Sequence, residues 1–117
     1  MSTQHPQFRH EQTQALDALG NPLRRKIMEL LAAKPHNVGE LAQLLPVSRP
    51  AVSKHLQVLG EAGLVTHRAS GASNVYSLEA AGFENARNWL DGFWNEALGR
   101  FRMVAENLPS NDPEQRS

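Results

Sequence analysis

Apolar residues recur at helical spacing between Val38 and Val65, in two groups separated by a segment that contains Pro46 and Pro50. The first group is Leu41, Leu44 and Leu45, and the second group is Val52, Leu56 and Leu59. Spacings of three and four residues place each group on one face of an α-helix. Pro46 ends the first segment, and Ser48 is a favourable N-cap for the second. The pattern therefore predicts two short helices joined by a tight turn.

Capping residues and turn signals divide the rest of the chain into further elements. Asn21 and Pro22 favour a helix start, because Asn caps well and Pro is tolerated at the first helical position. Asn37 is placed to cap the first of the two short helices, and Gly71 marks the tip of a hairpin. The other expected segments are helices over residues 11–19, 23–33 and 79–107 and strands over residues 64–68 and 74–78. This order predicts a mainly α fold with a small β-hairpin, the winged helix-turn-helix.

The length of 117 residues leaves room for one domain. We expect one winged helix-turn-helix domain over residues 11–108, with flexible tails at 1–10 and 109–117. No segment approaches the roughly 18 uninterrupted apolar residues of a membrane span, and the N-terminus lacks the apolar run of a secretory signal. With no cysteine, the chain forms no disulfide and no zinc–thiolate site. A cytoplasmic protein without a membrane partner is expected.

The formal net charge is zero, which argues weakly against a nucleic-acid partner, but the charges are unevenly distributed. Between positions 21 and 78, seven Lys and Arg residues stand against three Glu residues. From position 79 onward, four Arg residues stand against seven acidic residues. The neutral total therefore conceals a basic middle and an acidic C-terminal part.

The second short helix carries candidate DNA-reading residues. At about 100° per residue, Ser53, Lys54 and Gln57 fall nearly opposite its apolar face. Such side chains bond base edges or phosphates, and Arg49 is suited to reading guanine through two hydrogen bonds. A solvated polar face remains an equal alternative on these residues alone. The candidate residues are Ser48, Arg49, Pro50, Ala51, Ser53, Lys54, His55 and Gln57.

The predicted hairpin offers a second contact with DNA. A wing lies beside the groove, touches phosphates and usually carries Lys or Arg. Arg68 stands at the base of this hairpin, whereas the tip from Ser70 to Ser73 is uncharged. Backbone N–H groups and hydroxyls at such a tip can hold a phosphate. We therefore expect contacts from Arg68 and Ser73 and a weakly anchored wing.

Apolar residues on the final helix form a stripe wider than the core of one small domain needs. Both tryptophans and three of the four phenylalanines belong to it. Part of the stripe packs internally, and self-association explains the excess. A twofold dimer places two recognition helices about 34 Å apart, one turn of DNA. The expected interface residues are Leu16, Leu19, Phe83, Leu90, Phe93, Trp94, Ala97, Phe101 and Val104.

No arrangement of residues indicates an enzyme. The five histidines have no paired carboxylates or nucleophile at a recognisable spacing, and there is neither a Gly-rich phosphate loop nor a His-Glu-x-x-His helix. We expect no cofactor and no metal site. His36 and His55 are interpreted as structural or surface residues.

Several strings occur in a recognisable order along the chain: LGNPLRRKIMELL at 19–31, VGELA at 38–42, VSRPAVSKHL at 47–56 and LGEAGLV at 59–65. Together with the hairpin from Gly71 to Tyr76, they resemble the ArsR/SmtB family of bacterial repressors over about residues 13–105. The resemblance implies a homodimeric winged-helix repressor that binds double-stranded operator DNA, often at its own promoter. It also implies that the first and last helices build the dimer interface.

The chain departs from the metal-sensing members of that family. They carry a Cys-Val-Cys-Asp-Leu string beside the third helix, and here Asn37 and Gly39 stand at the two cysteine positions. The family's other metal site uses Asp and His on the final helix, but no histidine lies beyond His67. The wing also lacks a second arginine common in the family. The resemblance therefore implies the branch without the cysteine box, with an unidentified effector.

The leading hypothesis is a dimeric, sequence-specific DNA-binding regulator that represses its own or adjacent genes, with an unknown small molecule or a metal as effector. One alternative is a regulator responsive to nickel or zinc through carboxylates and residues such as His5 and His10. A second alternative is a winged-helix adaptor that binds proteins, which the near-neutral charge would suit.

Overall fold

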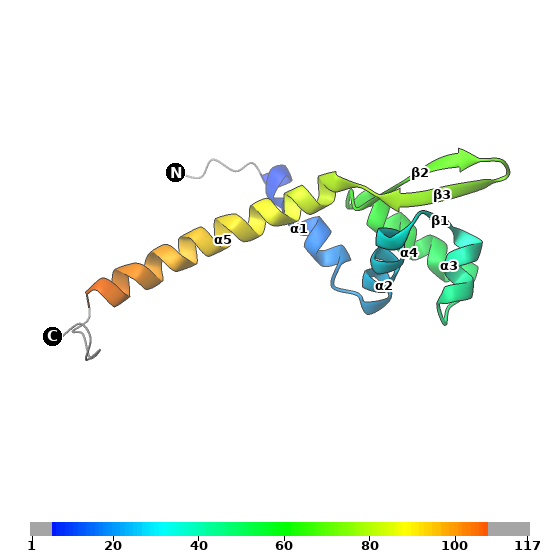
Figure 1. The fold of residues 1–117 in the computed structure, drawn as a ribbon. Helices are drawn as coiled ribbons and strands as arrows, with labels where there is room; N and C mark the ends of the chain where they lie inside the picture. The colour runs from blue at the N-terminus through cyan, green and yellow to red at the C-terminus, as the bar shows by residue number, and fades with distance from the viewer. Residues whose placement is uncertain (1–5, 108–117) are drawn as a thin grey trace.

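The computed structural model describes residues 6–107, with side-chain environments from residue 12 onward. Within that part, the five helices follow one another in the order that the sequence predicts, together with three short strands, and the mainly α, winged helix-turn-helix fold class is confirmed (Figure 1). The helices are α1 (Pro6–Ala18), α2 (Pro22–Ala33), α3 (Val38–Leu44), α4 (Arg49–Glu61) and α5 (Ala80–Glu106). The strands are β1 (His36–Asn37), β2 (Val65–Ser70) and β3 (Ser73–Leu78).

The three predicted N-caps are confirmed by hydrogen bonds. Asn21 Oδ1 accepts from the backbone N–H groups of residues 23 and 24, at 2.9 and 3.1 Å. Asn37 and Glu40 form a reciprocal capping box at 2.8 Å in both directions. Ser48 Oγ accepts from Ala51 N at 3.3 Å, which orients the first turn of α4. These caps satisfy N–H groups that a helix start otherwise leaves unpaired.

Helix α1 begins at Pro6, five residues before the start that the apolar pattern indicated. Residues 6–10, expected in a tail, are therefore helical in the structure. Pro is compatible with the first helical position, and this segment holds too few apolar residues to show a helical period.

The sheet has three strands in the order β1-β3-β2, where the sequence predicted a hairpin of two. His36 pairs with Tyr76 and Asn37 with Val75, so His36 belongs to a strand and not to a connecting loop. Two residues are too few to show an alternating pattern. The hairpin strands are also longer than predicted, because Gly71, at φ +60°, allows a two-residue turn with Ser70 paired to Ser73.

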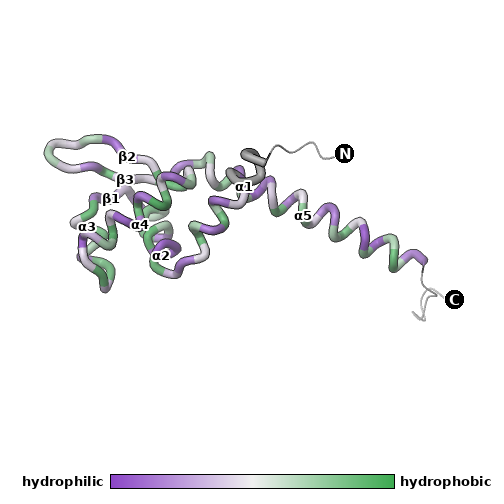
Figure 2. The backbone as a smooth tube through the Cα atoms, turned by 180° about the vertical axis from the view of Figure 1, so that it is seen from behind, coloured by the Kyte–Doolittle hydropathy of each residue, from purple (hydrophilic) through white to green (hydrophobic). Residues whose placement is uncertain are grey.

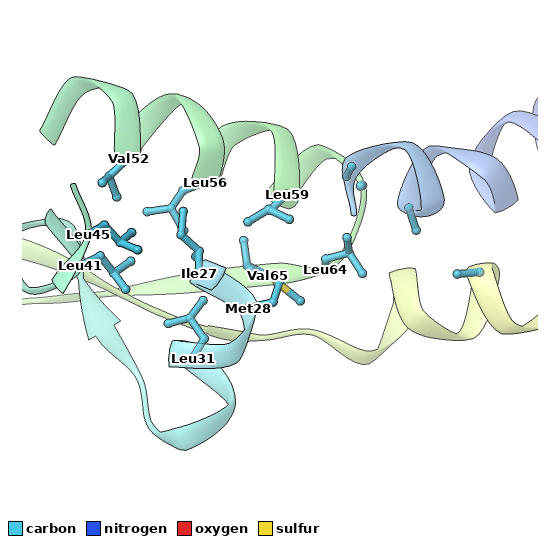
Figure 3. Close-up of a cluster of buried hydrophobic side chains, with 14 residues drawn as sticks. Ile27, Met28, Leu31, Leu41, Leu45, Val52, Leu56, Leu59, Leu64 and Val65 are labelled. Atoms are coloured by element: carbon cyan, nitrogen blue, oxygen red, sulfur yellow. The ribbon is translucent and has the colours of Figure 1, made fainter. Parts of the chain in front are cut away.

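The hydrophobic core lies between α2, α3, α4 and the start of the wing (Figure 3). Helix α4 contributes the residues predicted for its buried face, each at most 1% exposed. Met28, which the sequence analysis did not assign to the core, is buried as well. The residues labelled in the core are Ile27, Met28, Leu31, Leu41, Leu45, Val52, Leu56, Leu59, Leu64 and Val65.

Helix α5 is joined tightly to the core at its first turn and then extends away from it (Figure 1). Gly82 N–H donates to the Gly63 carbonyl at 2.7 Å, and Glu79 N–H donates to the Leu64 carbonyl at 2.9 Å. Beyond this joint α5 packs against α1. Hydrophobic and hydrophilic residues alternate along the rest of the helix, as Figure 2 shows. The 71 Å length of the molecule reflects this extension.

Candidate nucleic-acid interface

Helix α4 buries one face in the core and turns the predicted polar face to solvent. Ser53, Lys54 and Gln57 are exposed, as are Ser48, Arg49 and Pro50 at the N-terminal end. Ala51 and His55 lie at the border of the two faces and are partly buried. Because Ser48 caps α4 through Ala51 N–H, its hydroxyl already has a local role. The structure therefore presents the predicted residues on one accessible surface.

His55 differs from the other predicted residues in its protonation. Partial burial lowers the pKa of the His55 imidazole below its ordinary value of 6.5, and the charges of Arg24 and Lys54 lower this pKa further. The neutral imidazole is therefore the favoured form at neutral pH. At that pH, His55 offers hydrogen bonding and packing, and not a cation for a phosphate.

An acidic residue borders the polar face of α4. The Gln57 amide donates to Glu61 Oε2 at 3.5 Å, a long hydrogen bond between exposed side chains. The carboxylate makes the C-terminal end of α4 unfavourable for DNA phosphates, whereas Arg49 and Lys54 make its N-terminal half favourable. The i+4 spacing of Glu61 from Gln57 is sufficient to predict this contact from the sequence.

Part of the basic middle of the chain has a structural role. Arg24 Nε donates to the Ala18 carbonyl at 2.6 Å, and Arg25 Nη1 donates to the Leu19 carbonyl at 2.8 Å. These carbonyls belong to the end of α1, where helix geometry leaves them without partners. The charge excess that the sequence shows between positions 21 and 78 is therefore shared between α4 and the α1–α2 connection.

A polar cleft lies where the first turns of α3 and α4 meet the wing; we call it the Arg49 cleft. It is lined by Asn37, Val38, Gly39, Arg49, Ser53, Ser73, Asn74 and Tyr76. The Arg49 guanidinium lies against Gly39: a Cβ atom on Gly39 would be 2.9 Å from Nη2 and 3.3 Å from Cζ. The side chain thus points back over α3 in this structure.

A second groove separates the C-terminal half of α4 from the base of the wing. His67 and Tyr76 meet there, with ring centroids 5.0 Å apart, and both line the groove together with Gln57 and Glu61. Successive residues of a strand point to opposite faces, so Arg68 lies on the other face of the wing from His67. The pairing of the strands, which sequence alone did not show, places Arg68 on the face that does not line this groove.

The wing tip is uncharged, as its sequence indicates. Ser73 lies in β3 and not in the turn, and its hydroxyl donates to the Ser70 carbonyl at 3.5 Å. Its position at the edge of the Arg49 cleft brings it toward the start of α4. Ser73 therefore stays a candidate contact through the cleft.

The predicted interface residues divide into two groups. Leu16 and Leu19 are partly buried and pack against the core of their own chain. Most of the α5 stripe is exposed, with Phe101 at 70% and Trp94 at 54%. Ala97 is partly buried. The exposed large apolar residues of α5 are Phe83, Leu90, Phe93, Trp94, Leu98, Phe101, Met103 and Val104, of which Leu98 and Met103 were not predicted.

Histidines and carboxylates do not gather into a metal centre in the part of the chain whose side chains are described: no group of three potential ligands lies together there. His36 is buried, and its Nδ1 lies 3.8 Å from Glu40 Oε1 without a hydrogen-bond partner. His5 and His10, named as alternative ligands, lie outside the residues with described side chains. No described helix is long and apolar enough to span a membrane.

A recognition helix beside a β-hairpin defines the class of winged helix-turn-helix proteins, and comparison with known proteins specifies the family. A profile of the bacterial regulatory proteins of the arsR family matches residues 21–67. The HTH-type transcriptional regulator Rv2034 of Mycobacterium tuberculosis is 47% identical over 93 residues, covering 80% of this chain and 87% of the relative. This chain belongs to the ArsR family, as the motifs implied; it is a transcriptional regulator and not an enzyme.

Two further comparisons agree with this assignment. The transcriptional repressor SdpR of Bacillus subtilis is 32% identical over 79 residues, which cover 68% of this chain and 88% of the repressor. The structure of an ArsR-like transcriptional regulator from Rhodococcus sp. RHA1 matches with a TM-score of 0.72 and 27% identity. That match covers 91% of this chain and all of the Rhodococcus chain.

Proposed function

We propose that this protein acts as a homodimeric repressor that binds double-stranded operator DNA at its own or adjacent genes. The observation that carries the proposal is that two helices expose surfaces of different chemistry: α4 exposes a polar face, whereas α5 exposes an apolar face. The first is suited to the edges of base pairs and the second to another apolar surface. The name of SdpR as a transcriptional repressor supports repression. For a bacterial regulator that binds operator DNA, we expect the dimer to work in the cytoplasm.

In the proposed complex, the N-terminal half of α4 enters the major groove. Ser53 and Gln57 are placed to bond base edges or phosphates, and the Lys54 ammonium pairs with a phosphate. Residues Pro50 and Ala51 are small enough to let the helix approach the groove closely. The wing lies alongside, with Arg68 on its outer face.

Dimerisation through α5 explains why so many large apolar side chains are exposed. Phe93 stacks on Trp89, with centroids 5.5 Å apart, and contacts Trp94 edge-on at 5.7 Å. Beyond Trp94, the apolar stripe continues with Phe101 and Val104 on the same side of the helix. Burying it against the α5 of a second copy removes this surface from water and relates the two recognition helices by a twofold axis.

The dimer is tested with two substitutions that are two residues apart on α5. Phe101 lies on the apolar stripe and is 70% exposed, whereas Met103 is 64% exposed and follows about 200° further around the helix. We expect Phe101→Glu to give a monomer in sedimentation experiments, because a carboxylate would have to be buried in the interface. Met103→Glu should remain dimeric and serves as the matched control. A dimeric Phe101→Glu protein would contradict this interface.

DNA binding is tested by selection from random duplexes with the purified protein. A twofold dimer should enrich an inverted repeat whose half-sites are about one helical turn apart. Placing the enriched site between a promoter and a reporter gene should then lower expression when the protein is present. If no motif is enriched, the protein does not read DNA by sequence; if expression rises, it is not a repressor.

A further inference from the structure

Gly39 is a glycine that its own backbone does not require. Within the described residues, Gly63 and Gly71 are the glycines with positive φ, so Gly39 has a conformation that any residue adopts. It lies near the start of α3, where glycine is a poor helix former. What occupies the space of the missing side chain is the Arg49 guanidinium, 2.9 Å from the position of a Cβ atom. The glycine thus makes room for Arg49.

The Arg49 cleft is suited to an anion because its charge is not neutralised. Arg49 is the one charged residue among those that line it. Across the described part of the chain, no carboxylate lies within ion-pair distance of this guanidinium. The planar guanidinium presents several N–H donors in a geometry that matches the oxygens of a phosphate.

Neutral donors surround the guanidinium on the other sides of the cleft. Asn37 uses its Oδ1 atom to cap α3, which leaves its amide N–H groups available. Ser53 contributes a hydroxyl from α4, and Asn74 contributes a side-chain amide from β3. Donors from three elements therefore line the same cleft as one cation, and such a combination suits an oxyanion through charge-assisted hydrogen bonds.

We propose that the Arg49 cleft binds one phosphate group. Arg49 supplies the positive charge, and the absence of a side chain at Gly39 leaves the space in which the Arg49 guanidinium lies. Two sources supply this chemistry: a phosphate of the DNA backbone, which rests on the proposed function, and free phosphate in solution. Under this proposal Arg49 anchors the start of α4 on the duplex and does not read a guanine. The wing takes part through Asn74 in its stem, and its uncharged tip is not needed.

Three variants of the full chain test the proposal. Arg49→Gln removes the charge at an exposed position, and Gly39→Ala places a methyl group where the guanidinium lies. The displaced atoms are the end of a flexible side chain, so Gly39→Ala should fold normally while moving Arg49. Gly92→Ala is the matched control, because nothing lies within 4 Å of the new Cβ atom. Thermal unfolding verifies that each variant is folded.

The first arm measures the affinity for the selected operator and for a scrambled duplex over a range of salt concentrations. A lost phosphate contact should weaken both complexes by the same factor and reduce the salt slope by about 0.9 per contact. We expect this for Arg49→Gln and Gly39→Ala but not for Gly92→Ala. Loss confined to one base pair of the operator would mean that Arg49 reads a base, which overturns the proposal.

The second arm titrates the DNA-free protein with inorganic phosphate at constant ionic strength and follows the amide NMR signals of Gly39, Ser53 and Asn74. Saturable shifts that Arg49→Gln abolishes support the site for free phosphate, whatever happens with DNA. An unchanged salt slope together with absent shifts overturns the proposal. If the unmodified protein binds no duplex, the proposed function is wrong. In that case the NMR titration with inorganic phosphate decides by itself whether the Arg49 cleft binds phosphate.

Discussion

The joint between the recognition helix and α5 depends on a close approach of two backbone segments, which makes Gly82→Ala a sharp test of the fold. A Cβ atom at Gly82 would lie 2.4 Å from the Ala62 carbonyl oxygen and 2.7 Å from the carbonyl carbon and oxygen of Gly63. All three are backbone atoms, and non-bonded heavy atoms prefer about 3.5 Å or more. The two segments therefore have to separate by about 1 Å.

The free-energy change follows from three contributions. Overpacking of this kind typically costs about 1–3 kcal/mol. Separation also weakens the 2.7 Å hydrogen bond from Gly82 N–H to the Gly63 carbonyl, with a net loss of about 0.5–1.5 kcal/mol. Replacing glycine by alanine in a helix returns up to about 1 kcal/mol. Together these contributions lead us to expect that Gly82→Ala lowers the free energy of unfolding by about 0.5–3.5 kcal/mol.

Urea denaturation at a fixed protein concentration measures this effect. The midpoint should fall while the slope with denaturant stays the same. Gly92→Ala, whose Cβ atom meets open space, receives the helix-propensity gain alone and should be more stable by about 0.5–1 kcal/mol. If Gly82→Ala is as stable as Gly92→Ala, the close approach of α5 to the Gly63 turn does not exist in solution.

Three more substitutions test separate parts of the structure. His55 has a folded-state pKa below 6.5, so its contribution to stability is present above pH 6.5 and lost as the pH falls from there through the folded pKa. When the pH is lowered from about 7.5 to about 5.5, the free energy of unfolding should therefore decrease less for His55→Gln than for the unmodified protein. Equal decreases, measured by urea unfolding at each pH, would exclude this role. Lys54→Ala should weaken binding to all duplexes alike and reduce the salt slope by about one in binding titrations; an unchanged slope removes Lys54 from the phosphate contacts. Asn21→Ala should destabilise the protein by about 1 kcal/mol in urea unfolding, because two N–H groups at the start of α2 lose their acceptor; no change would mean that water replaces the cap without cost.

Residue spacing predicts part of the candidate site on α4. The buried face of α4 and its polar face could be assigned from residue spacing, because both follow from the helical period. The direction of Arg49 could not, because it depends on Gly39, ten positions earlier in another helix. Likewise, the side of the wing that faces α4 is set by the packing of Tyr76 against the core, and alternation along β2 then places Arg68 on the opposite side from His67.

The number of basic residues in a segment is a weaker predictor of DNA contacts than the local spacing of residues within one helix. The basic residues at the start of α2 raised the expectation of a DNA contact, yet Arg24 and Arg25 bond to carbonyl groups at the end of α1. A count of charges along the chain does not distinguish a side chain that completes a helix end from one that faces DNA. The Gln57–Glu61 contact, by contrast, lies within one helix and follows from its spacing.

Residue spacing and local hydrogen bonding specify the succession of helices, their caps and the class of fold. Asn21, Asn37 and Ser48 act on N–H groups two or three residues away, and such local interactions are specified wherever the residues occur. Long-range packing sets the pairing of β1 with β3, the place of Arg49 over Gly39 and the approach of Gly82 to Gly63. These contacts join segments distant in the chain, and they form only once the core has brought those segments together.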